Sequence, residues 1–152
     1  MRFILIIFAT LLFNFSVLAD LINPNPNILP EKVISIQLEA LMKNDMPYQD
    51  AGISQTWEFA HPKNRQFTGP LANFKQMMKS DSYGLMIDHI NHNIIYVSDN
   101  ENMANYFVEL TDKTGNKFGF TWIVSKVLVD GKFKNCWMTT SVSGPEFLGE
   151  VI

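Results

Sequence analysis

The chain has 152 residues, of which 47% are hydrophobic and 18% are charged, and its formal net charge at pH 7 is −3. This length suffices for a single domain with one hydrophobic core. Because the charges are mixed and slightly acidic, the sequence argues against nucleic-acid binding and against a stable association of the mature protein with a membrane.

Residues 1–19 have the three-part pattern of a secretory signal peptide. Arg2 is followed by an apolar run over residues 3–13, broken only by Thr10, and residues 17–19 (Val-Leu-Ala) suit the cleavage positions. We predict cleavage after Ala19 and a periplasmic or secreted protein. The alternative is a retained membrane anchor, although the apolar run is shorter than a spanning helix needs.

Residues 20–29 predict a spacer, because its segment 23–27 (Asn-Pro-Asn-Pro-Asn) favours extended or turn conformers and has nothing to bury. The first helix is expected over residues 30–44, because Pro30 suits its first turn and Glu31 complements its dipole. Apolar residues then recur every three or four positions, so this helix should pack on the sheet, against residues such as Trp122 and Trp137. The face consists of Val33, Ile34, Gln37, Leu38, Leu41 and Met42.

A second helix is expected to begin at Asp50, a favoured N-cap residue, and to stop before Pro62, which disfavours helix at the preceding residue. His61 should then lie in its last turn, where an imidazole stabilises the helix dipole. Thr68-Gly69-Pro70 should open a third helix. The apolar face of that helix consists of Leu71, Phe74, Met77 and Met78.

The hydrophobic period changes after Gly84 from the helical spacing to that of strands. Residues 86–98 are rich in Ile and Val, and residues 103–110 alternate between apolar and more polar side chains. Residues 112–116 predict a turn and residues 118–129 a strand. Asp130-Gly131 predicts a two-residue hairpin leading into residues 132–142. Residues 30–152 therefore predict one α+β domain, with N-terminal helices packed on a curved antiparallel sheet.

Several segments resemble an uncharacterised domain-of-unknown-function family with bacterial and plant-plastid members. The resemblance covers nearly the whole mature chain. The segments are 37–41 (Gln-Leu-Glu-Ala-Leu), Asn44-Asp45, 47–53, 59–62 (Phe-Ala-His-Pro), 67–71 (Phe-Thr-Gly-Pro-Leu), Phe74, Met77 and 136–139 (Cys-Trp-Met-Thr). Since no activity is assigned to that family, the resemblance implies no catalytic residue.

In element order that family resembles the nuclear transport factor 2-like (cystatin-like) cone, whose helices pack in the concavity of a bent antiparallel sheet. This resemblance implies a pocket between the sheet and the first helices. Proteins with the cone fold include ketosteroid isomerase, scytalone dehydratase, and non-catalytic binding and dimerisation modules, so the resemblance leaves the function open.

Asp88-His89-Ile90-Asn91-His92 is the main candidate for chemistry, because an Asp beside a His can orient the imidazole for acid–base work. On a strand, however, His89 and His92 should point apart, and no third ligand is near in sequence, so we expect no metal site. The simpler interpretation is a set of exposed polar residues at a strand end.

Tyr83, with Tyr48 and Asp50, forms a second set, since a Tyr and a carboxyl in an apolar pocket can promote enolisation. N-capping explains Asp50 more simply. Cys136 is the only cysteine, so it forms no internal disulfide, and its apolar neighbours predict a buried structural thiol on a central strand. No phosphate-, zinc- or redox-type motif is present, and we expect no cofactor.

Two functions remain open. The first is a non-catalytic binding or interaction module, engaging a small apolar ligand in the pocket or a second copy through the sheet face. The alternative is a small hydratase or isomerase that uses Asp88, His89 or Tyr83. The enzyme requires a carboxylate or imidazole in an enclosed apolar pocket, whereas a purely apolar lining favours binding.

Overall fold

A computed structural model describes residues 20–150, and the predicted signal peptide lies outside the described residues. The helices come first: α1 (Pro30–Leu41), α2 (Ala51–Glu58), α3 (Pro62–Thr68), α4 (Leu71–Met78) and the short 3-10 helix η1 (Gly84–Met86). The strands follow: β1 (Asn91–Asp99), β2 (Met103–Thr111), β3 (Asn116–Lys126) and β4 (Trp137–Glu150). The predicted α+β arrangement is confirmed.

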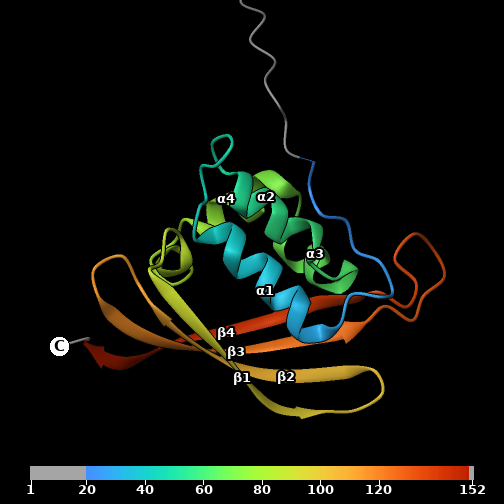
Figure 1. Cartoon of the computed structure of the whole chain (residues 1–152). Helices are drawn as coiled ribbons and strands as arrows, with labels where there is room; N and C mark the ends of the chain where they lie inside the picture. The colour runs from blue at the N-terminus through green and yellow to red at the C-terminus, as the bar shows by residue number, and fades with distance from the viewer. Residues whose placement is uncertain (1–19, 151–152) are drawn as a thin grey trace, which may run out of the picture.

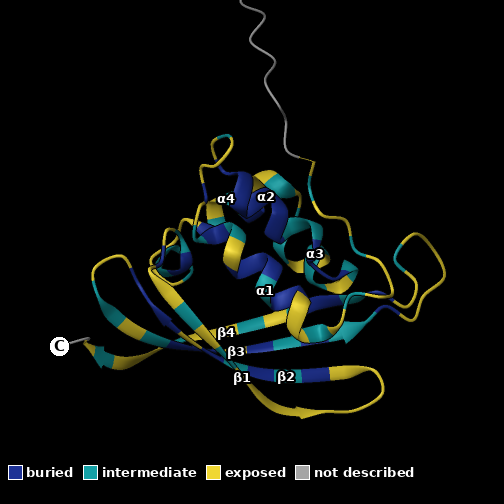
Figure 2. Ribbon diagram, in the orientation of Figure 1, coloured by how far each residue is buried: buried dark blue, intermediate teal, exposed yellow. Residues whose placement is uncertain are grey.

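The strands form one curved antiparallel sheet in the order β1-β2-β3-β4, and the helices lie on one face of it (Figure 1). In β2, Tyr106 and Val108 are buried against the helices, whereas Phe107 and Glu109 point to the other face. The predicted alternation of this strand is therefore confirmed. Figure 2 shows buried residues concentrated where the helices and the sheet meet.

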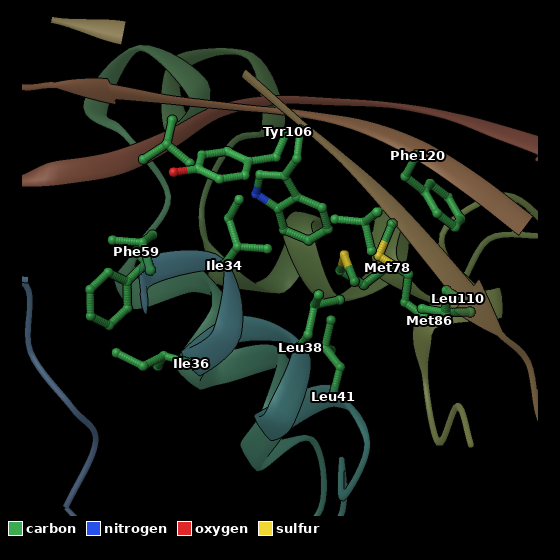
Figure 3. Close-up of a cluster of buried hydrophobic side chains, with 14 of the residues drawn as sticks. Ile34, Ile36, Leu38, Leu41, Phe59, Met78, Met86, Tyr106, Leu110 and Phe120 are labelled. Atoms are coloured by element: carbon green, nitrogen blue, oxygen red, sulfur yellow. The ribbon is translucent and has the colours of Figure 1, made fainter. Parts of the chain in front are cut away.

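Helix α1 supplies the centre of the hydrophobic core. Pro30 occupies its first turn and Glu31 adds an acidic side chain there. The face predicted from the sequence is buried except for Met42, which is half-buried and follows the last residue of the helix. Figure 3 shows Ile34, Leu38 and Leu41 of this helix in the same cluster as side chains from the sheet. Trp122 is buried in this core, and Trp137 packs against its edge.

Pro62 begins a helix that the sequence analysis did not predict, because proline at the first helical position can start one helix as well as end another. His61 is thus not in the last turn of α2. It is the N-cap of α3, and its Nδ1 accepts a hydrogen bond from the Lys63 backbone N–H at 3.1 Å. Arg65 of α3 donates to the backbone oxygens of Trp57 (2.8 Å) and Ala60 (3.0 Å), which satisfies carbonyls at the end of α2.

The predicted capping role of Asp50 is wrong. Asp50 precedes α2 with a φ of 61°, outside the extended conformation of a typical N-cap, and its side chain makes no capping hydrogen bond. Its carboxylate instead lies 2.8 Å from the Nζ of Lys79, at the end of α4. The hydrogen bond from Lys79 lowers the pKa of Asp50, and the pair ties the start of α2 to α4.

The connection between β3 and β4 is longer than the predicted two-residue turn at Asp130-Gly131. It spans residues 127–136 and is closed by the bonds Val127 N–H to Cys136 O (2.9 Å) and Asn135 N–H to Val127 O (2.8 Å). Asn135 adopts a φ of 64°, which lets the chain turn back into β4. Cys136 is buried as predicted, but it precedes an edge strand instead of lying on a central one.

The segment before α1 is attached to the helices. Ile22 donates its N–H to Gln55 Oε1 at 2.7 Å and accepts from Gln55 Nε2 at 2.8 Å, so one amide side chain holds both backbone groups. Ile28 packs against the core.

Over residues 20–150, no helix combines the length and apolar character that crossing a membrane would require.

Candidate functional site

A cavity of about 240 Å³ lies between the helices and the strands β3 and β4. All four helices and η1 contribute to its wall. The lining residues are Gln37, Leu41, Thr56, Ala60, Asn64, Phe67, Thr68, Phe74, Met77, Met78, Tyr83, Met86, Trp122 and residues 139–142. Phe67 is 90% exposed, so the cavity reaches the surface beside the end of α3.

Aliphatic and thioether side chains form the apolar part of the wall. Leu41 comes from the same face of α1 as Gln37, one helical turn earlier, because residues four apart are neighbours on a helix. Figure 3 shows Leu41, Met78 and Met86 converging from α1, α4 and η1. Methionine side chains are unbranched and adaptable, so this wall can fit ligands of different shape.

A directed chain of hydrogen bonds forms the polar part of the wall. Trp122 Nε1 donates to Thr139 Oγ1 at 3.0 Å, and the Thr139 hydroxyl donates to Gln37 Oε1 at 2.6 Å. Gln37 Nε2 then donates to the Thr56 carbonyl at 3.0 Å. Because the Thr56 carbonyl can only accept, the Gln37 NH₂ group faces Thr56 and Oε1 faces Thr139, so the Thr139 hydroxyl is the donor between them.

The same threonine joins the helices to the sheet through its backbone. Thr139 donates its N–H to the Phe59 carbonyl, and its own carbonyl accepts from the His61 N–H, both at 2.8 Å. Asn64 Nδ2 also donates to this carbonyl at 3.3 Å. On the other side of the cavity, the Tyr83 hydroxyl donates to the Val142 carbonyl at 3.0 Å. The cavity therefore has a braced wall along β4.

No ionisable acid or base other than the Tyr83 phenol is among the residues that line the cavity. The lining has no carboxylate, imidazole, ammonium or guanidinium group. Among residues 20–150, moreover, every buried side-chain nitrogen or oxygen has a hydrogen-bond partner. The cavity thus combines apolar surface with neutral polar groups, and it has no acid–base pair for proton transfer.

The prediction that His89 lies at an exposed strand end is wrong, because His89 is only 2% exposed. Its Nδ1 lies 2.7 Å from the Met86 carbonyl and its Nε2 lies 2.7 Å from His92 Nδ1. Since Nδ1 must donate to the carbonyl, Nε2 accepts from His92. Burial lowers the pKa of His89 to about 4, so the ring is neutral near pH 7.

The expectation that His89 and His92 point apart is also wrong, and its cause is local. β1 begins only at Asn91, and Asp88 has a φ of 56°, so the intervening residues turn instead of alternating as in a strand. The Asp88 backbone N–H donates to the Leu41 carbonyl at 2.9 Å. Its carboxylate makes no hydrogen bond to His89 among the described side chains, so the two do not form an acid–base dyad.

Of the three proposed catalytic residues, only Tyr83 lies at the cavity; Asp88 and His89 do not line it. Tyr48 lies at a shallow depression on another side of the helices, and Asp50 is engaged by Lys79. Within residues 20–150, no group of three or more His, Cys, Asp or Glu side chains is arranged to hold a metal ion. The structure thus separates the residues that the enzyme hypothesis would combine.

Gln37 and Thr139 are the site residues that the sequence analysis missed as functional. Gln37 was visible as the one polar residue on the apolar face of the first helix, which marks a position that needs a buried partner. Thr139 gave no comparable sign.

Comparisons of the chain with protein-family models, with curated proteins and with solved structures found no match.

Proposed function

We propose that this domain is a non-catalytic binding module, which holds a small and largely apolar molecule in the cavity between the helices and β3–β4. The observation that carries this proposal is the lining, which offers apolar surface and neutral hydrogen-bonding groups but no acid–base pair. Ligand pockets are typically apolar cavities with a few placed polar groups.

The volume indicates the size of the ligand. A cavity of 150 Å³ in another protein holds benzene. By proportion, the 240 Å³ found in this domain admits a molecule of about ten non-hydrogen atoms. This corresponds to a two-ring compound or a chain of about eight carbons with a small head group.

The test is isothermal titration of residues 20–152 with octan-1-ol. We expect saturable binding with one site per chain. Met77→Trp, which places a large ring in the cavity wall, should abolish binding. Met42→Trp is the matched control, because Met42 is half-buried directly after α1 and does not line the cavity. If octan-1-ol does not bind, or if both variants bind as wild type does, the cavity is not the binding site.

The alternative enzyme is not favoured, because Asp88 and His89 lie outside the cavity. A dimer through the sheet is not favoured either. On the outer face, Ile95 pairs with Phe107, but the next partners in the same row are Thr121 and Ser143, and Glu109 lies beside them. Such a mixed row differs from the apolar centre of a typical homodimer interface.

Export and the cone resemblance are part of the same proposal. Helices packed on one face of a curved antiparallel sheet, with a cavity between them, support the resemblance to the nuclear transport factor 2-like cone. The tripartite sequence pattern supports cleavage after Ala19. N-terminal sequencing of the protein from its host should begin at Asp20, and recovery of an intact N-terminus in the membrane fraction would contradict export by cleavage.

A further inference from the structure

We propose that the ligand of the cavity is an uncharged molecule, with one neutral polar group such as an amide or alcohol on an apolar body. This inference rests on the proposed binding function and specifies its ligand class. It follows from the charges that the cavity lacks and from the hydrogen-bonding capacity that its polar wall retains.

A charged head group has no counter-ion in this cavity. None of the lining residues carries a positive or negative side chain near pH 7. Lys75 and Lys79 do not line the cavity, and their ammonium groups lie 3.8 Å and 2.8 Å from the Asp50 carboxylate. Moving an unpaired carboxylate or ammonium out of water is strongly unfavourable, so such ligands are selected against.

A neutral polar group, in contrast, finds unused hydrogen-bonding capacity on a buried residue. Gln37 is 1% exposed, and its amide carries two N–H donors and two acceptor lone pairs. In the described structure it donates once, to Thr56, and accepts once, from Thr139. One donor and one acceptor position remain, which an amide, an alcohol or a ketone can use.

The orientation of this amide is determined before any ligand binds. The Thr56 carbonyl can only accept, so Nε2 faces Thr56 and Oε1 faces Thr139, whose hydroxyl donates to it. A ligand therefore does not have to order the Gln37 side chain. Such preorganisation reduces the entropic cost of binding.

The apolar body of the ligand has a separate surface to contact. Leu41, Phe74 and Met86 line the cavity together with Met77 and Met78, and none of them carries a hydrogen-bond donor. The exposed Phe67 lies where the cavity reaches the surface, so a ligand can enter beside it. The wall thus has a polar part around Gln37 and Thr139 and a separate apolar part.

The experiment compares octanamide, octanoate and octylamine, which have nearly the same size and differ in charge, by isothermal titration at pH 7.5. We expect octanamide to bind, and octanoate and octylamine to bind roughly tenfold more weakly or worse. Octanoate or octylamine binding as tightly as octanamide would overturn this inference while leaving the binding function intact. If none of the three and no octan-1-ol binds, the proposed function itself fails.

A charge placed at the rim gives a second test that does not disturb the core. Thr68 is half-exposed at the end of α3 and lines the cavity. Thr68→Lys should strengthen octanoate binding at least about fivefold relative to octanamide, because it supplies the missing counter-ion. Thr68→Met, of similar length and uncharged, is the control. Equal octanoate affinities in the two variants would contradict an electrostatic basis for selectivity.

Discussion

Replacement of Thr139 by valine removes one hydroxyl and keeps the shape of the side chain. In the structure that hydroxyl accepts from Trp122 Nε1 at 3.0 Å and donates to Gln37 Oε1 at 2.6 Å. Thr139→Val therefore leaves two groups on buried residues without their partner. Each such orphan costs about 1–3 kcal/mol, so we expect the free energy of unfolding to fall by about 2–6 kcal/mol.

The assay is equilibrium unfolding in urea, followed by circular dichroism. Thr140→Val is the matched control. Thr140 is half-buried, and its hydroxyl donates to the Ile123 carbonyl at 3.1 Å, so its loss should cost about 1 kcal/mol or less. If Thr139→Val loses no more stability than Thr140→Val, the hydrogen-bond chain does not brace the cavity, and the argument from Gln37 fails with it.

Three further predictions concern the core, the histidine pair and the thiol. Leu38 is fully buried in α1, so Leu38→Ala should cost about 2–5 kcal/mol in the same assay, whereas alanine at the exposed Leu29 should stay within about 0.5 kcal/mol of wild type. Burial lowers the pKa of His89 in the folded protein to about 4, from the ordinary 6.5. Its neutral form therefore stabilises the fold by up to about 3 kcal/mol above pH 6.5. This contribution is lost as the pH falls from about 6.5 towards 4. Urea midpoints at pH 7 and pH 4.5 should accordingly differ less in His89→Gln than in wild type, and an equal difference would contradict the neutral buried ring. Burial raises the pKa of the Cys136 thiol, so a thiol reagent should label the native protein slowly and the unfolded protein fast; rapid labelling of the folded form would show an accessible thiolate.

Elements with a clear amphipathic pattern could be predicted from the sequence. The face of α1 around Leu38 and the alternation of β2 around Tyr106 are regular because one side of each element is buried. These patterns depend only on neighbours within one element. They therefore determined the order of helices and strands and the face that packs in the core.

The sequence did not reveal features that depend on a single backbone angle or on a distant partner. The contact between His89 and His92 results from the turn at Asp88, which has a positive φ. A positive φ is usually signalled by a glycine in the sequence, and this position has an aspartate. Pro62 is compatible with both the end of one helix and the start of the next. Gln37 and Thr139 meet across a sequence separation of 102 residues, so no local pattern can pair them.

The most direct test of ligand binding in the cavity is methyl NMR of the protein labelled at its methionines. Met77, Met78 and Met86 line the cavity, whereas Met42, Met46, Met103 and Met138 do not. Saturating octanamide should shift the methyl signals of the first three and leave the other four unchanged. If the shifts fall on the second group, or if no signal moves at millimolar octanamide, the cavity between the helices and β3–β4 is not a binding site.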